Sequence, residues 1–398
     1  MSYSHLIASI EESATLGIAQ KVRELKSQGR DVIGLTLGEP DFDTPEHIRT
    51  AAKEALDGGY THYPPVTGLP ELKEAIVHKL KRDNSLAYST ANVMVSTGAK
   101  QSLYNVVLAK VNPGDEVVIP APFWVSYEAM VRFAQGKPVY IPTSVASEYK
   151  ISPEQLDEAL TEKTRLMFFN SPSNPSGSMY NREEMAALVA VLEKYPHVSI
   201  ISDEIYEYIT YGKKHESLGT FSSIFDRVIT VNGFAKGFAM TGWRLGYIAT
   251  VDKTLLGLCS KIQGQSTSGA NAFAQKGAVV ALGEYMEPTY KMRDELLKRR
   301  DRVYTRLKAI PGVELPLPDG AFYFYPDFAP YLGKRSPDGK QIENIDQLCL
   351  YLIEEEGLAL VTGSAFGTQS HARLSYAYSD EILDDGLSRL ERGLGKLV

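Results

Sequence analysis

Short apolar runs with β-strand character alternate with stretches of helical periodicity between residue 93 and about residue 250. Each apolar run leads into a loop with unusual polar residues, and a helical stretch follows. Strands that alternate with helices favour a mostly parallel sheet between two layers of helices. In such sheets ligands bind beyond the carboxyl ends of the strands, where these polar loops fall. The predicted strands are Val93–Thr97, Glu116–Ile119, Leu166–Asn170, Val198–Ser202, Val228–Val231 and Leu245–Thr250.

The flanking sequence predicts further helices and a second domain. Residues 13–29 have helical spacing, and Thr44 followed by Pro45 is typical of an N-cap and first helical residue. A long helical pattern over residues 284–310 leads into a C-terminal region where strands and helices alternate again. We therefore expect a three-layer α/β large domain and a smaller α/β domain. The predicted divisions are an N-terminal segment packing with the small domain (1–47), the large domain (48–292) and the small C-terminal domain (293–398).

Composition excludes several classes of protein. The hydrophobic content of 43% and charged content of 23% over 398 residues are those of a soluble globular protein. A net charge of -7 without a basic cluster argues against a nucleic-acid partner. Residues 1–12 resemble neither a signal peptide nor a membrane anchor, so we expect a cytoplasmic protein without a membrane partner. Cys259 and Cys349 lie in apolar, helix-like contexts, which indicates packing rather than a disulfide.

Lys236 is placed among small and apolar residues between two predicted strands. A single lysine is usually a solvated surface residue. Here the ammonium group loses hydration, which lowers its pKa toward the range where a free amine attacks a carbonyl. Arg244 lies eight residues further on and offers a fixed cation for a phosphate. The pair therefore favours a functional site over two unrelated surface cations.

Two other strand ends offer groups for an anionic or cationic ligand. Asp203 ends an apolar strand, so it either forms a structural salt bridge or faces a protonated ring nitrogen. Gly98, Ala99 and Lys100 open a helix whose backbone N–H groups can bind an anion, although many strand-to-helix turns look alike.

Three more residues have both a structural and a functional interpretation. Trp124 is either a core residue or a stacking partner for a planar ring. Asn174 precedes a proline and is either a turn residue or a polar ligand. Arg373 lies inside a short apolar strand, where its guanidinium needs a carboxylate from the protein or from a substrate. Together with Lys236 and Asp203, these residues suit pyridoxal 5′-phosphate, which carries an aldehyde, a ring nitrogen and a phosphate.

Several motifs in order along nearly the whole chain resemble those of class I aminotransferases, which are fold-type I pyridoxal-phosphate enzymes. The similarity is greatest to the bacterial aspartate aminotransferases of subgroup I-beta. The motifs are Gly38-Glu-Pro-Asp-Phe, Tyr60-Thr…Gly68, Ser171-Pro-Ser-Asn-Pro-Ser-Gly, Ser202-Asp-Glu-Ile-Tyr, Ala235-Lys236 with Met240-Thr-Gly-Trp-Arg-Leu-Gly, Gly320-Ala-Phe-Tyr and Arg373-Leu-Ser-Tyr.

The resemblance implies a role for each matching residue. Lys236 is expected to form the Schiff base and shuttle the proton, with Asp203 paired to the ring nitrogen. The ring is expected to stack on Trp124 and to receive hydrogen bonds on its 3′-oxygen from Tyr206 and Asn174. The expected phosphate ligands are Gly98, Ala99, Arg244 and Tyr63 of the second subunit of a homodimer, and the expected ligands of the substrate α-carboxylate are Arg373, Asn174 and the Gly38 backbone.

Gly233 departs from the pattern of many relatives, which have serine or threonine three residues before the lysine. This departure puts one phosphate contact in doubt, but not the chemistry. The implied reaction is a ping-pong transfer between an amino acid and a 2-oxo acid. A β-lyase with the same lysine and aspartate is an alternative. The seven histidines form no ligand-spaced pair, so no metal site is expected.

Lys100 indicates the substrate. In the I-beta enzymes a lysine of similar placement meets the distal carboxylate of the substrate, which implies aspartate and 2-oxoglutarate. A cation is unfavourable at a helix N-terminus, so an anion is expected nearby. Preference for prephenate or for aromatic amino acids is the alternative. The prephenate subgroup usually has an additional cation near the N-terminus, where this chain has Glu11 and Glu12.

Overall fold

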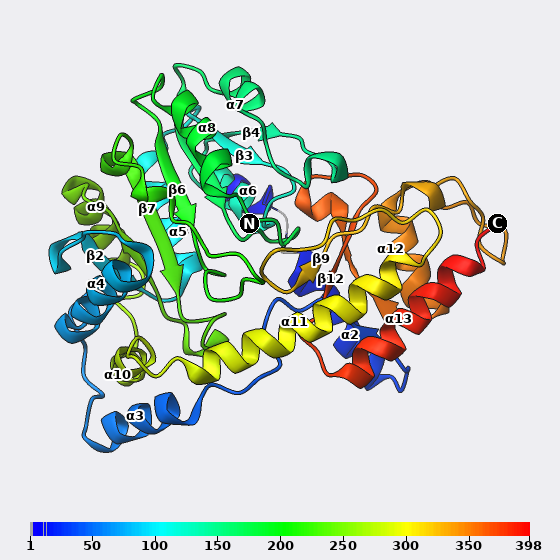
Figure 1. Ribbon diagram of the computed structural model, residues 1–398, viewed down its shortest axis with the longest axis horizontal. Coiled ribbons are helices and arrows are strands. Elements are labelled where there is room, and N and C mark those ends of the chain that lie inside the picture. Colours follow the sequence, from blue (N-terminus) through cyan, green and yellow to red (C-terminus); the bar gives the residue numbers. More distant parts are fainter. Residues whose placement is uncertain (1–2, 11, 13) are drawn as a thin grey trace.

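The computed structural model describes residues 3–10, 12 and 14–398. Figure 1 shows a large sheet covered by helices and a smaller α/β body beside it. The predicted α/β architecture is therefore confirmed. Within the described ranges no helix is both long and apolar enough to cross a membrane.

The large sheet has the strand order β2-β8-β7-β6-β5-β3-β4. Neighbouring strands from β7 to β4 pair in parallel, as the alternating pattern predicts. The exception is β8, which is antiparallel to both β7 and β2. The connection from β7 to β8 holds only a short 3₁₀ helix, Thr241–Trp243, and no crossover α-helix, and the chain turns back after it. The strands are β2 (Val93–Ser96), β3 (Glu116–Pro120), β4 (Lys137–Ile141), β5 (Thr164–Asn170), β6 (Ser199–Asp203), β7 (Val228–Gly233) and β8 (Gly246–Ala249).

Helices cover both faces of this sheet because its central strands are apolar on both sides. Phe168 packs in the cluster with α5, α6 and α9, whereas Phe169 packs against α7 and α8 on the other face. Near the β2 edge, α4 and α10 cover the face that carries Val95 and Tyr247. The helices are α3 (Glu46–Asp57), α4 (Pro70–Asn84), α5 (Ala99–Lys110), α6 (Ser126–Phe133), α7 (Pro153–Ala159), α8 (Arg182–Leu192), α9 (Lys253–Gly264) and α10 (Ala272–Ala281).

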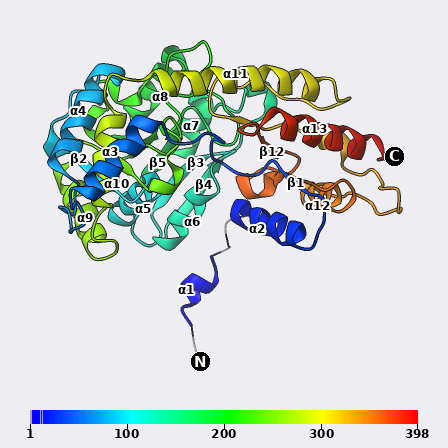
Figure 2. The same ribbon diagram turned by 90° about the horizontal axis from the view of Figure 1, so that it is seen from below.

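The smaller body has its own apolar core around a three-stranded antiparallel sheet, β11-β12-β9. The long helix α11 runs from the large body along the small one (Figures 1 and 2). An N-terminal strand, β1, pairs in parallel with β10 of the small body. The remaining elements are α1 (His5–Ala8), α2 (Ala14–Ser27), β1 (Ile33–Gly34), α11 (Glu287–Lys308), β9 (Tyr323–Phe324), α12 (Ile345–Glu355), β10 (Leu358–Ala359), β11 (Val361–Thr362), β12 (Ala372–Ser375) and α13 (Asp380–Gly395).

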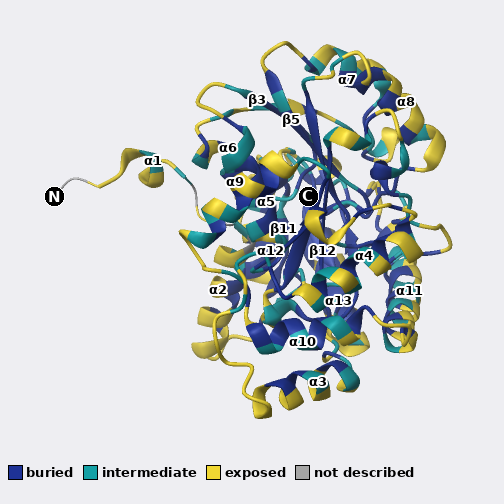
Figure 3. Ribbon diagram, turned by 90° about the vertical axis from the view of Figure 1, so that its left-hand side faces the viewer, coloured by how far each residue is buried: buried dark blue, intermediate teal, exposed yellow. Residues whose placement is uncertain are grey.

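Two local features differ from or extend the sequence-based expectations. The N-cap of α3 is Pro45, not Thr44 as predicted. The Thr44 hydroxyl instead donates to the Ala239 carbonyl at 2.6 Å and accepts from Trp243 Nε1 at 3.0 Å, so it ties the N-terminal segment to the loop that follows β7. The short helix α1 has no buried residue and extends away from the body (Figure 3).

Candidate active site

A cavity of about 300 Å³ lies at the carboxyl ends of the parallel strands. It is bounded by the loops after β2, β3, β5, β6 and β7 and by residues of the small body. It brings together eleven of the twelve predicted site residues. These are Gly38, Gly98, Ala99, Lys100, Trp124, Asn174, Asp203, Tyr206, Lys236, Arg244 and Arg373.

Lys236 lies in the loop between β7 and β8, and its amine donates to the Gly38 carbonyl. Burial lowers the pKa of the amine to about 8, and the positive charges of Arg373 and Arg244 act in the same direction. The carboxylates of Glu39 and Asp203 oppose this shift. The lysine is therefore poised to hold or release a proton near neutral pH.

Asp203 is the last residue of β6 and is buried at the floor of the cavity. Burial raises the pKa of its carboxyl group to about 6, although a hydrogen bond from the Tyr127 hydroxyl favours the ionised form. That hydroxyl donates to Asp203 Oδ2 at 2.6 Å. Among the described residues no cation forms an ion pair with Asp203, so its charge is available to a ligand.

A cradle for an anion forms where α5 begins. Gly98 has a φ of 86°, which favours glycine, and an added Cβ would lie 2.7 Å from Arg244 Nη2. Two buried hydroxyls beside it, Ser96 Oγ and Thr97 Oγ1, have no hydrogen-bond partner within the described chain. Arg244 contributes its guanidinium, which donates through Nη1 to the Thr241 carbonyl at 2.8 Å. The free donors and the space left by glycine suit a phosphate group.

Arg373 reaches the cavity from β12 of the small body and is 1% exposed. Its Nη1 donates to Asn174 Oδ1 at 2.9 Å and its Nη2 to the Thr36 carbonyl at 2.7 Å. Its Nε has no partner in the part of the chain that the structure describes. The two acceptors are uncharged, so no carboxylate of the described residues pairs with this guanidinium. Of the two predicted sources of a carboxylate, the substrate is the one left.

Lys100 and Trp124 form a wall of the cavity. Lys100 Nζ lies 4.9 Å from the centre of the Trp124 ring. Burial, with a contribution from Arg244, lowers the pKa of the Lys100 amine. No described carboxylate forms an ion pair with it, so this lysine is not a structural ion-pair partner at the helix start.

Comparison with known proteins identifies the family. The family model for aminotransferase class I and II matches residues 30–390. This chain is a class I and II aminotransferase.

Full-length relatives and solved structures are similar to this aminotransferase. An aspartate/prephenate aminotransferase from Cereibacter sphaeroides is 45% identical, covering 98% of this chain and 97% of the relative. An aspartate aminotransferase from Bacillus subtilis is 41% identical over the whole of both chains. The crystal structure of an aspartate aminotransferase from Rhizobium meliloti has a TM-score of 0.96 and 40% identity, with complete coverage of both chains.

Tyr63 is the predicted site residue that this aminotransferase does not bring into the cavity. Its side chain is 94% exposed. A residue that reaches the site of a second subunit has to point away from its own cavity, and the role of Tyr63 stays a prediction.

Glu12 does not lie where the predicted repulsion of prephenate would require it. Glu11 lies outside the described residues, whereas Glu12 is exposed and does not line the cavity. Leu16, near the start of α2, does line it. Repulsion of prephenate by Glu12 at the cavity wall is therefore not supported by this geometry.

Gly233 is required by the close pairing of β7 and β8. A Cβ at this position would lie 2.9 Å from the Leu245 carbonyl oxygen and 3.1 Å from Gly246 Cα. A serine or threonine here would force the strands apart. The aminotransferase therefore lacks a hydroxyl ligand at this position for a structural reason.

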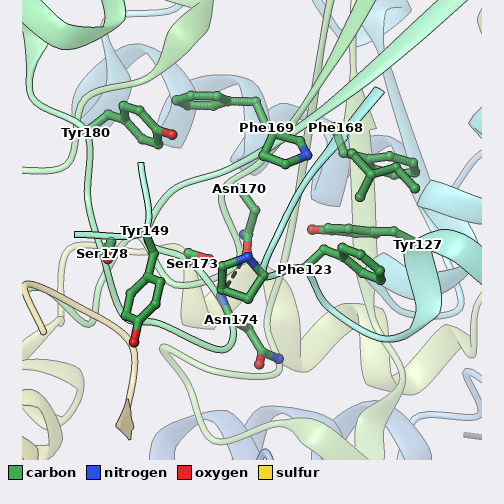
Figure 4. Close-up of a pocket in the computed structure, with 13 residues that line it drawn as sticks. Phe123, Tyr127, Tyr149, Phe168, Phe169, Asn170, Ser173, Asn174, Ser178 and Tyr180 are labelled. Carbon is green, nitrogen blue, oxygen red and sulfur yellow. Dashed lines mark hydrogen bonds between the residues drawn. The ribbon is translucent and has the colours of Figure 1, made fainter. Parts of the chain in front are cut away.

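Tyr127 and Tyr323 are cavity residues that sequence reasoning did not assign. The Tyr127 ring stacks on Phe168 with centroids 4.2 Å apart (Figure 4). This stacking fixes the hydroxyl that donates to Asp203. A small cavity of about 30 Å³ lies next to Tyr127 and Asn174, with room for about one water molecule. The available sequence signals were the spacing of Tyr127 from Trp124 and the motif that ends in Tyr323.

One cluster in the described chain has metal-ligand character without suiting a metal. Ligand atoms of Glu204, Glu207 and His215 lie within 4.8 Å of one another. However, Glu207 pairs with the buried ammonium of Lys79 and accepts from Asn84 and Asn232, each at 2.8 Å. The ammonium already supplies a positive charge at this position, so the cluster is a structural ion network.

Proposed function

We propose that the chain is an aspartate aminotransferase that uses pyridoxal 5′-phosphate and transfers the amino group of L-aspartate to 2-oxoglutarate. The products are oxaloacetate and L-glutamate, formed in a ping-pong reaction. The observation that carries the proposal is the set of cations around the cavity, Lys100, Lys236, Arg244 and Arg373. None of them is paired with a carboxylate of the described residues.

Arg373 is buried and Lys236 is partly buried, and a cation withdrawn from water without a counter-ion needs an anionic ligand. Lys100 and Arg244 are more exposed but line the same cavity. The phosphate of the cofactor fits the cradle of Gly98, Ala99 and Arg244. The two carboxylates of aspartate fit Arg373 and Lys100, which both line the cavity. A substrate with one carboxylate would leave Lys100 without a counter-ion, which favours a dicarboxylic substrate.

The residues of this chain supply the proton transfers and the orientation. When bound, the cofactor supplies a carbonyl carbon that accepts the amino group and a ring that withdraws electrons. Lys236 Nζ, with a pKa of about 8, takes the proton from the substrate Cα and returns it during the transfer. Asp203 holds a proton on the ring nitrogen, and Trp124 stacks on the ring. Tyr206 and Asn174 donate to its 3′-oxygen, while Arg373 and the Gly38 backbone hold the α-carboxylate.

The proposal extends to the assembly and location of the protein. We infer a cytoplasmic homodimer in which Tyr63 reaches the phosphate of the partner's site. Within each subunit, residues 1–47 belong with a small domain, 293–398, and residues 48–292 form the cofactor-binding domain. The pairing of β1 with β10 supports this division.

Mixing two inactive variants tests the shared site. A dimer of one Lys236→Ala subunit and one Tyr63→Ala subunit retains one complete site. Random exchange of equal amounts therefore restores up to about a quarter of wild-type activity. No recovery after subunit exchange would contradict the shared site, and an active monomer in sedimentation would contradict the dimer.

Transfer to prephenate is a second candidate, favoured by the absence of Glu12 from the cavity wall and by the name of the Cereibacter sphaeroides relative. The kcat/KM values for 2-oxoglutarate and prephenate, measured with aspartate as donor, decide whether the enzyme uses one amino-group acceptor or both. Activity with prephenate below a hundredth of that with 2-oxoglutarate would exclude it as a comparable substrate.

Reduction with borohydride followed by peptide mapping tests the assignment of the reactive lysine. The cofactor label is expected on Lys236. Its recovery on any other lysine would overturn the proposed roles.

A further inference from the structure

The motif Gly320-Ala-Phe-Tyr ends in a tyrosine whose hydroxyl contacts a proposed cofactor ligand. Tyr323 is fully buried at the start of β9, and its hydroxyl lies 2.8 Å from that of Tyr206. The two rings meet edge to face with centroids 5.9 Å apart. The Tyr323 hydroxyl has no other hydrogen-bond partner among the described residues.

Both tyrosines are held in place by backbone contacts between their segments. The Ala321 N–H donates to the Ile209 carbonyl at 2.9 Å, which joins the motif to the segment that follows β6. Tyr323 also pairs with Ser375 across the sheet of the small body. The hydroxyl contact therefore does not depend on the free rotation of either side chain.

The surroundings favour the Tyr323 hydroxyl, rather than the Tyr206 hydroxyl, as the donor in the hydrogen bond between them. The Arg373 guanidinium lies over its ring, 4.5 Å from the centroid. Burial raises the pKa of both hydroxyls. At Tyr323 the second largest effect is the positive charge of Arg373, which lowers the pKa. A more acidic hydroxyl is a stronger hydrogen-bond donor.

We propose that Tyr323 is a positioning residue that donates to the Tyr206 oxygen and so orients and strengthens Tyr206 as the donor to the cofactor's 3′-oxygen. This inference rests on the proposed use of pyridoxal phosphate. A hydrogen bond received by Tyr206 polarises its own O–H, because bonds in a chain reinforce one another. Tyr323 thereby acts on the cofactor without touching it.

The direction of the effect follows from the charge of the 3′-oxygen. A donor to this oxygen stabilises its ionised form and lowers the pKa of the cofactor bound at Lys236. Loss of the Tyr323 hydroxyl weakens the donor, so the pKa must rise. The other titratable or charged groups facing the tyrosine pair are Arg373, Asp203, Glu39, Tyr378 and Lys236. All of them are retained when Tyr323 is changed to phenylalanine.

The test is a pH titration of the visible absorbance of the cofactor-loaded protein. Tyr323→Phe keeps the ring and its contact with Arg373, and is expected to raise the pKa of the chromophore by about half to one unit, a threefold to tenfold change in the ionisation constant. The kcat with aspartate is expected to fall by a similar factor, with little change in KM. In a Tyr206→Phe background, the same substitution should produce no further shift.

Tyr376→Phe is the matched control, because it removes a hydroxyl from another buried tyrosine pair, Tyr376 with Tyr211 at 3.2 Å, outside the cavity. An unchanged pKa in Tyr323→Phe, or an equal shift in the control, would overturn the inference. A full further shift in the Tyr206→Phe background would also overturn it.

Gly38→Ala provides an independent route if Tyr323→Phe does not fold. The added methyl would meet the Tyr323 hydroxyl at 2.8 Å and displace it from Tyr206, so the pKa should again rise. A fall would contradict the inference. If the wild-type protein forms no visible chromophore at Lys236, the proposed function fails and the inference fails with it; a normal wild-type chromophore with unshifted variants refutes Tyr323 alone.

Discussion

Replacing Asp203 with asparagine should stabilise the cofactor-free protein, and increasingly so as the pH rises. Burial raises the pKa of this carboxyl group from its ordinary 3.8 to about 6. The folded protein therefore binds a proton that the unfolded chain has already released between these values. Folding stability falls as the pH rises through this window, by about 3 kcal/mol in total, because one pKa unit corresponds to about 1.4 kcal/mol.

The asparagine variant lacks this proton, whereas it keeps an oxygen that accepts from Tyr127. The difference in the free energy of unfolding between the variant and the wild type should grow by about 1.4 kcal/mol between pH 5 and pH 7.5. The rest of the total of about 3 kcal/mol develops below pH 5. Urea denaturation of both cofactor-free proteins across this range measures the difference.

An Asp226→Asn variant makes the same chemical change at an exposed position outside the cavity and serves as the control. A wild-type advantage at neutral pH, or a difference between the two proteins that does not vary with pH, would show that Asp203 carries no buried charge. Asp203 would then have no buried negative charge to pair with a cationic ring nitrogen.

Three further predictions concern the cavity. Lys100→Ala should cost roughly 2–5 kcal/mol in kcat/KM toward aspartate and much less toward an apolar amino acid, and equal losses would show that it does not bind the distal carboxylate. Gly98→Ala should weaken cofactor affinity at least tenfold by equilibrium dialysis, because its Cβ would lie 2.7 Å from Arg244 Nη2; unchanged affinity would contradict the phosphate cradle. Asp203→Ala should bind the cofactor but lose about 4 kcal/mol or more of transition-state stabilisation, and near-normal turnover would refute its role.

The predicted site residues that the structure brings into one cavity share a position at the end of a strand. Lys236, Asp203 and Gly98 follow or end apolar runs, and the carboxyl ends of parallel strands meet at one edge of the sheet. Their placement in one cavity therefore follows from the shared direction of the strands that precede them. Arg373 was predictable for another reason, since a guanidinium within an apolar strand requires a partner.

The residues that the sequence missed depend on contacts between distant segments. The Tyr127 hydroxyl meets Asp203, and the Tyr323 hydroxyl meets Tyr206, across 76 and 117 residues of chain. A tyrosine in an apolar stretch gives no indication of where its hydroxyl will point. Thr44 had the local signature of an N-cap, but its hydroxyl bonds to a loop 195 residues away. The direction of β8 was equally hidden, because periodicity does not distinguish parallel from antiparallel strands.

A single half-reaction tests most directly whether the protein is an aspartate aminotransferase. The purified, cofactor-loaded protein is mixed with excess L-aspartate in the absence of any oxo acid, and oxaloacetate and ammonia are quantified together with the visible spectrum. We expect one equivalent of oxaloacetate for each subunit, a loss of the visible absorbance and no ammonia. Continued release of ammonia, or an unchanged spectrum with no oxaloacetate, would contradict this assignment.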